Sequence, residues 1–90
     1  MNWSETLYEE EDKFTYCQYS DGQIVEKEGF EEIEYICEIP KEEGLPYSFR
    51  QFEIFLKNIE PRGNMDIFES FLKSKNIKYK THIWQKPKID

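Results

Sequence analysis

The chain has 90 residues, of which 34% are charged, and its formal net charge at pH 7 is −7. This is the length of one domain, so the sequence predicts a single acidic domain over residues 1–90. A negative field repels nucleic acid and anionic membranes and attracts basic protein surfaces, so the composition argues against direct nucleic-acid binding and against membrane binding.

Cysteine content and the amino-terminal sequence restrict the function classes further. Cys17 and Cys37 are too few for a disulfide framework and lack the spacing of a zinc or redox motif. Both fall in alternating strand patterns, which predicts that they are small buried hydrophobic residues. The polar, acidic amino-terminal residues contain no apolar run that would suit a signal peptide or a membrane span. We therefore expect a cytoplasmic protein.

The acidic residues are concentrated in the first half of the chain. Residues 1–43 hold fourteen Asp and Glu against three Lys, whereas residues 44–90 hold five acids against nine Lys and Arg. The amino-terminal half is therefore expected to build an acidic surface.

The chain opens with signals for a short helical turn followed by a hairpin. Thr6 and Glu9 have the spacing of a capping box, which predicts a helical turn near Thr6 that the acidic residues 9–12 end. Residues 13–19 then alternate in the manner of a strand. Asp21 and Gly22 are typical of the type I′ turn of a β-hairpin, and that turn predicts a further strand over residues 24–28.

Residues 31–39 predict a strand with one acidic face. Alternation places Ile33, Tyr35, Cys37 and Ile39 on one face and Glu32, Glu34, Ile36 and Glu38 on the other. Glutamate is a poor strand former, and like charges two residues apart repel each other. The acidic face is therefore unfavourable unless a neighbouring strand or a partner neutralises it.

The period then changes to that of two amphipathic helices. Ser48 is a candidate N-cap, with apolar residues following at Phe49, Phe52, Phe55, Leu56 and Ile59. Asn64 is the candidate N-cap of a second helix, and Asn76 is the residue expected to end it; its apolar stripe is Ile67, Phe68, Phe71 and Leu72. Residues 77–84 alternate again, with Lys78, Lys80, His82 and Trp84 on the polar face.

This order of elements predicts an α+β fold. Strands joined by short turns pair antiparallel, so we expect a mostly antiparallel sheet of about four strands. The single apolar stripe of each helix requires cover, which places both helices on one face of that sheet. The other face would point to solvent or to a partner.

The sequence offers no motif for catalysis. His82 is the only histidine, and no glycine-rich loop opens either helix, so we expect no catalytic, cofactor or metal site and no enzyme. An enzyme with a carboxylate-bound metal ion is the third-ranked alternative.

The glutamates of residues 31–39 have two explanations. In the first, the last strand lies beside them, and Lys78 and Lys80 pair with the acidic side chains. In the second, the carboxylates imitate phosphates, because residues two apart on a strand are about 6.6 Å apart and duplex DNA carries one charge per roughly 1.7 Å of axis. The expected partner-binding residues are Glu9, Glu10, Glu11, Asp12, Glu32, Glu34, Ile36 and Glu38, with Tyr8 and Tyr19 as further aromatic anchors.

In size, charge and interspersed aromatic residues, the chain resembles the small acidic DNA-mimic proteins that bacteriophages use against restriction enzymes and other host DNA-binding systems. The resemblance implies an antirestriction inhibitor, in the cytoplasm of an infected bacterium, that blocks or sequesters a basic nucleic-acid-binding protein or nuclease. An immunity protein that plugs a basic nuclease toxin fits the same features. A structural or adaptor subunit that docks through its acidic half is the alternative from another class. Ile36, surrounded by glutamates, would also suit a homodimer contact.

Overall fold

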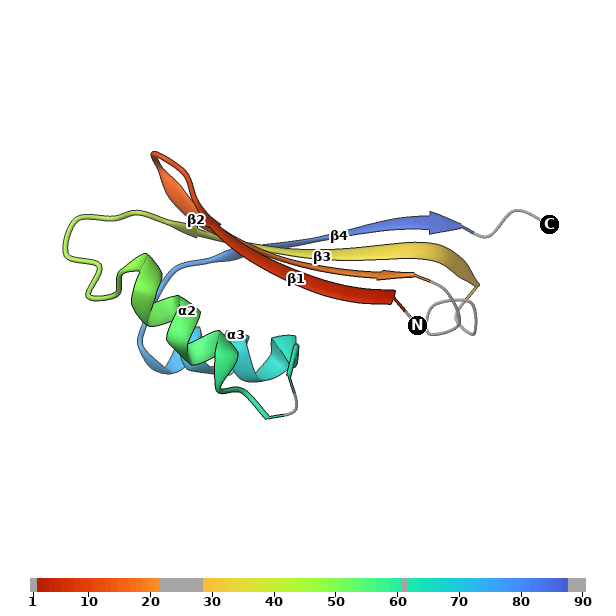
Figure 1. The fold of residues 1–90 in the computed structure, drawn as a ribbon. Coiled ribbons are helices and arrows are strands. Elements are labelled where there is room, and N and C mark those ends of the chain that lie inside the picture. Colours follow the sequence, from red (N-terminus) through yellow and green to blue (C-terminus); the bar gives the residue numbers. More distant parts are fainter. Residues whose placement is uncertain (1, 22–28, 61, 88–90) are drawn as a thin grey trace.

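A computed structural model describes residues 2–21, 29–60 and 62–87. Within them the chain forms a sheet of four antiparallel strands, each paired with its neighbour in sequence order. The strands are β1 (Asn2–Glu9), β2 (Lys13–Asp21), β3 (Phe30–Pro40) and β4 (Lys80–Pro87), with helices α2 (Phe49–Lys57) and α3 (Met65–Ser74) between β3 and β4. Both helices lie on one side of the sheet, which extends beyond them at one end (Figure 1). The predicted α+β class is confirmed.

The amino-terminal segment is a strand, so the helical turn predicted near Thr6 is wrong. β1 pairs with β2 along its whole length, from Asn2 opposite Asp21 to Glu9 opposite Phe14. A helix of one turn has a high nucleation cost, whereas pairing with β2 satisfies a full row of backbone groups. The capping-box spacing is therefore outweighed by strand pairing.

Strand β2 runs further than predicted and pairs with β3, from Lys13 opposite Pro40 to Asp21 opposite Glu32. Asp21, predicted as a turn residue, is instead the last residue of β2, while Gly22 and the whole strand predicted over residues 24–28 lie outside the described residues. The strands predicted over residues 13–19 and 31–39 are confirmed by β2 and β3.

The helix ends follow the predicted capping residues. The backbone N–H of Ser48 donates to Oε1 of Gln51 at 2.7 Å, and Asn64 Oδ1 accepts from the N–H of Ile67 at 3.3 Å. After α3, Asn76 adopts a left-handed backbone with φ of 56°. The N–H of Ile77 then donates to the carbonyl of Leu72 at 2.9 Å, as in a Schellman motif.

The core lies between the helices and the sheet and is rich in aromatic rings. Phe14 on β2 meets Phe52 on α2 edge to face at 5.4 Å between ring centroids, and Tyr16 meets Phe68 on α3 at 5.3 Å. Cys37 is fully buried among these residues, as predicted. Cys17 is only half-buried, because it lies on the face of the sheet that the helices leave uncovered.

Candidate partner-binding surface

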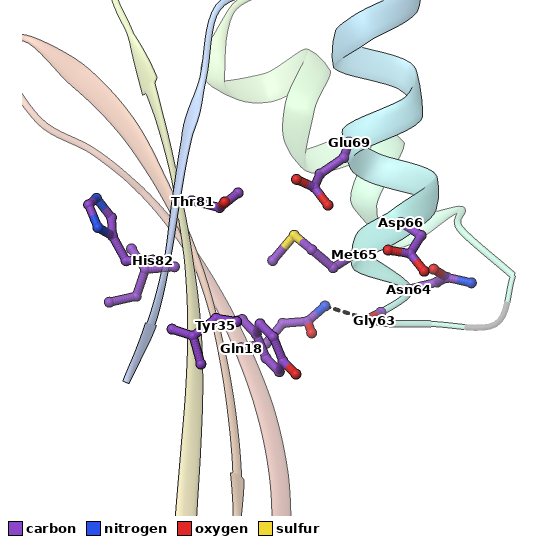
Figure 2. Close-up of a pocket in the computed structure, with 11 residues that line it drawn as sticks. Gln18, Tyr35, Gly63, Asn64, Met65, Asp66, Glu69, Thr81 and His82 are labelled. Atoms are coloured by element: carbon purple, nitrogen blue, oxygen red, sulfur yellow. Dashed lines mark hydrogen bonds between the residues drawn. The ribbon is translucent and has the colours of Figure 1, made fainter. Parts of the chain in front are cut away.

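The helix-free face of the sheet, called here the open face, carries the predicted acidic row. The strand register places even-numbered residues of β1, β3 and β4 on it together with odd-numbered residues of β2. Figure 2 shows this alternation on β4, where Thr81 points toward α3 and His82 points away from it. The open face includes Thr6, Tyr8, Lys13, Thr15, Cys17, Tyr19, Glu32, Glu34, Ile36, Glu38, Lys80, His82, Trp84 and Lys86.

Glu38 is neutralised within the protein. Its carboxylate forms an ion pair with Lys13 and lies 2.6 Å from Nε2 of His82. The hydrogen bond from Lys13, followed by that from His82, holds the pKa of Glu38 below its ordinary value. Lys80 lies opposite Glu38 in the register, but Glu38 forms its ion pair with Lys13 and a hydrogen bond with His82. The last strand therefore does lie beside the acidic row, although the expected lysines are not its cations.

Glu32 lies at the far end of the row, where no cation of the described residues is within ion-pair distance of it. It accepts a hydrogen bond of 2.5 Å from the Tyr19 hydroxyl, which raises the pKa of Tyr19. Asp21 lies opposite Glu32 on β2, and Tyr19 also contacts its carboxylate at 3.3 Å. On the other side, Lys86 is opposite Glu32 in the register but forms its ion pair with Glu31, at 3.5 Å. This end of the open face therefore presents two adjacent carboxylates.

Glu34 occupies the middle of the row between two aromatic side chains. Tyr19 lies opposite it on β2 and Trp84 lies opposite it on β4. Among the described residues, no cation lies within ion-pair distance of Glu34. Trp84 is 51% exposed, although tryptophan usually buries most of its ring. The centre of the open face is therefore a carboxylate flanked by two aromatic side chains.

The predicted acidic segment 9–12 lies at the opposite end of the sheet from Glu32. Glu9 faces the helix side, where it pairs with Lys41 at 2.6 Å, and Glu10 accepts a hydrogen bond of 2.8 Å from Thr15 on the open face. Glu11 and Asp12 are exposed in the turn between β1 and β2 and make no ion pair in the described part of the chain. The segment therefore adds two uncompensated carboxylates to one end of the open face.

The fold brings together most of the predicted surface. Glu32, Glu34, Ile36 and Glu38 share the open face, with Glu10, Glu11 and Asp12 at its rim; Glu9 points to the other side. Sequence reasoning placed His82 and Trp84 on one face of the last strand but did not assign them to this surface. The missing information was the strand order, since β4 joins the sheet beside β3 only after two helices.

No family model, curated protein or solved structure matches this chain. The described helices are all too short or too polar to cross a membrane. Within the described residues, His, Cys, Asp and Glu side chains form no group of three that would hold a metal ion.

Proposed function

We propose that this protein is an acidic inhibitor that occupies the nucleic-acid-binding groove of a basic protein and so blocks or sequesters it. The observation that carries the proposal is the centre of the open face, where Glu34 lies between Tyr19 and Trp84 and no cation of the described residues lies within ion-pair distance of it. A basic groove offers cations to such a carboxylate and flat surfaces to the rings.

The spacing of the carboxylates supports a phosphate surrogate. Glu32 and Glu34 are about 6.6 Å apart along β3, and the row from Glu32 to Glu38 spans roughly 20 Å. That length corresponds to about six base pairs of duplex DNA. The row holds three glutamates over that length and Glu38 is paired with Lys13, so the charge density of the row is well below that of duplex DNA. We infer that the carboxylates set the rate of association and that Tyr19, Trp84 and Ile36 set the lifetime of the complex.

Several partner classes share the required basic groove. A restriction nuclease, another host defence factor and a nuclease toxin would all present cations spaced to hold phosphates.

A structural or adaptor role is the second candidate, favoured by the edge strand β4. All its residues are exposed, and Ile83 and Trp84 present apolar side chains to solvent at 58% and 51% exposure. An exposed edge with apolar side chains can accept a strand from another protein. Such docking would depend on apolar contact, so salt would weaken it little.

The proposal is tested by capture from a bacterial lysate on immobilised protein, followed by elution with duplex DNA. The test variant is E34K. The matched control is E60K, which makes the same charge change at an exposed residue just after α2. We expect wild type and E60K to retain a nucleic-acid-binding protein that duplex DNA releases, and E34K to retain much less of it. Equal retention by E34K, no release by DNA, or no retained protein at all would refute the proposal. Melting curves confirm that both variants are folded.

A further inference from the structure

A cleft of about 360 Å³ opens on the helix side of the sheet, between α3 and strands β3 and β4. Figure 2 shows Met65 and Glu69 reaching from α3 toward β4 across this space. The residues that matter for its chemistry are Gln18, Tyr35, Met65, Asp66, Glu69 and Ile83. Ile36 and His82 of the open face also border the cleft, but the carboxylates of α3 and the side chains of Gln18, Tyr35 and Ile83 line it from the helix side of the sheet.

The walls of the cleft combine apolar surface with an aromatic ring. Ile83 on β4 is 58% exposed and Tyr35 on β3 is 38% exposed, although both lie on the helix side of the sheet. Together with Met65, these side chains would suit a ligand with an aliphatic stem.

Two carboxylates give the cleft its charge. Asp66 and Glu69 are three residues apart on α3, so they lie on neighbouring positions of one helix face. Neither forms an ion pair with a described residue. Burial is the main cause that raises the pKa of the Cys37 thiol to about 12, and the negative charge of Glu69 is the next. This effect of Glu69 on a sheet residue is consistent with a carboxylate that points toward the sheet. An anionic ligand would be repelled here, although the helix N-terminus alone would attract one.

Gln18 adds a fixed hydrogen-bond acceptor. Its side chain is only 6% exposed, and its Nε2 donates to the Tyr16 hydroxyl oxygen at 2.8 Å and to the carbonyl oxygen of Gly63. Because a carbonyl can only accept, the amide nitrogen must face Gly63, which fixes the orientation of the amide. No described residue donates to its Oε1. The carboxylates of Asp66 and Glu69 and the Gln18 Oε1 can only accept, whereas the hydroxyls of Tyr35 and Thr81 can either donate or accept, so a ligand rich in donors fits this lining.

We propose that this cleft binds the guanidinium group of an arginine side chain presented by a partner protein. A guanidinium carries five N–H donors in a planar fork, which suits acceptors on both the helix and the sheet. Its positive charge matches Asp66 and Glu69, its plane can lie on the ring of Tyr35, and its stem can lie along Met65 and Ile83. The inference does not depend on the open face, and it stands or falls separately from the proposed function.

The test is an NMR titration of the full chain with N-acetyl-arginine amide, followed through backbone amide signals. The matched probe is N-acetyl-citrulline amide, which has nearly the same shape but no charge. We expect saturable shifts for Gly63, Thr81 and Ile83, with a Kd on the order of millimolar for a single side chain. The citrulline probe should leave these signals in place. D66N and E69Q should each weaken binding roughly threefold, and E60Q should not change it.

Three results would overturn the inference. The first is equal shifts with arginine and citrulline, because charge would then be irrelevant. The second is a set of shifts centred on Glu11, Asp12 and Glu34 and absent from the cleft. The third is unchanged binding in D66N and E69Q. N-acetyl-lysine amide should bind more weakly than the arginine probe, and equal binding would contradict recognition of a guanidinium.

Discussion

Trp3 on β1 lies directly against Gly63 in the segment between α2 and α3, so that a Cβ atom added at residue 63 would overlap the indole carbon Cζ2. Gly63 also has a positive φ of 79°, and its carbonyl accepts the hydrogen bond from Gln18 on β2. Trp3 and Gly63 therefore bring the edge of the sheet against the connection between the two helices.

G63A should destabilise the protein more than G44A does. Gly44 has a similar φ of 84°, but no atom lies near the position of its missing Cβ, so G44A should cost about 1–2 kcal/mol from backbone strain alone. G63A adds the overlap with Trp3, which should cost about 1–3 kcal/mol more. Urea unfolding measures both free energies. Equal losses would show that Trp3 can move aside freely.

Y16F should lower the free energy of unfolding by about 1–3 kcal/mol, because buried polar groups lose a partner. The Tyr16 hydroxyl donates to Glu5 at 2.6 Å and accepts from Gln18 at 2.8 Å. Y47F is the control, since Tyr47 packs in the same core through its ring. Equal stability of Y16F and wild type in denaturant unfolding would contradict a stabilising role for this network.

The same hydroxyl predicts a loss of stability at alkaline pH. Burial raises the pKa of Tyr16, so the folded state retains the phenolic proton to a higher pH than the unfolded state does. The contribution is fully present below the ordinary tyrosine pKa of about 10 and is lost as the pH rises above it. Unfolding free energies measured across this range should fall less steeply in Y16F than in wild type. Parallel curves would refute the prediction.

E38Q should reduce the loss of stability in acid. The pKa of Glu38 is lowered in the folded state, first by Lys13 and then by His82, so the unfolded state binds the proton more readily. Stability from this group is present above the ordinary carboxyl pKa and is lost as the pH falls through the lower, folded value. K13A removes the larger of the two causes that lower the pKa of Glu38. It should therefore also reduce the loss of stability in acid, but by less than E38Q does. Thermal melts from neutral to acidic pH test this, and an unchanged slope in both variants would contradict it.

F52A should cost about 3–5 kcal/mol, a large part of the stability of a domain of this size. Phe52 is fully buried and contacts the rings of Phe14, Tyr47 and Phe68. F55A should cost less, because Phe55 is only partly buried and lies on one side of the core. Denaturant unfolding measures the loss of stability in both variants. A larger loss in F55A than in F52A would contradict this description of the core.

Local signals in the sequence predicted the parts of the fold that local interactions determine. The helix ends at Ser48, Asn64 and Asn76 depend on contacts between residues close together in the sequence. All three predicted helix ends were correct. The strand β1 was missed because its formation depends on pairing with β2, whereas the capping-box spacing at Thr6 is visible locally. Which cations reach Glu38 also depends on strand order, which periodicity does not encode.

The cleft had no sequence signal at all. It lies between α3 and strands β3 and β4, elements that are far apart in the chain. Asp66 and Glu69 looked like ordinary helix-surface acids, and Gln18 looked like one polar residue in an alternating strand. Their common location is a property of the tertiary structure.

The central claim is that the open face occupies a nucleic-acid-binding groove, and equilibrium competition tests it most directly. The measurement is the apparent Kd between this protein and its captured partner at increasing concentrations of duplex DNA. We predict that the apparent Kd rises in proportion to the DNA concentration, without limit, because the two ligands exclude each other. An apparent Kd that is unchanged by DNA, or a complex containing all three molecules, would contradict the claim.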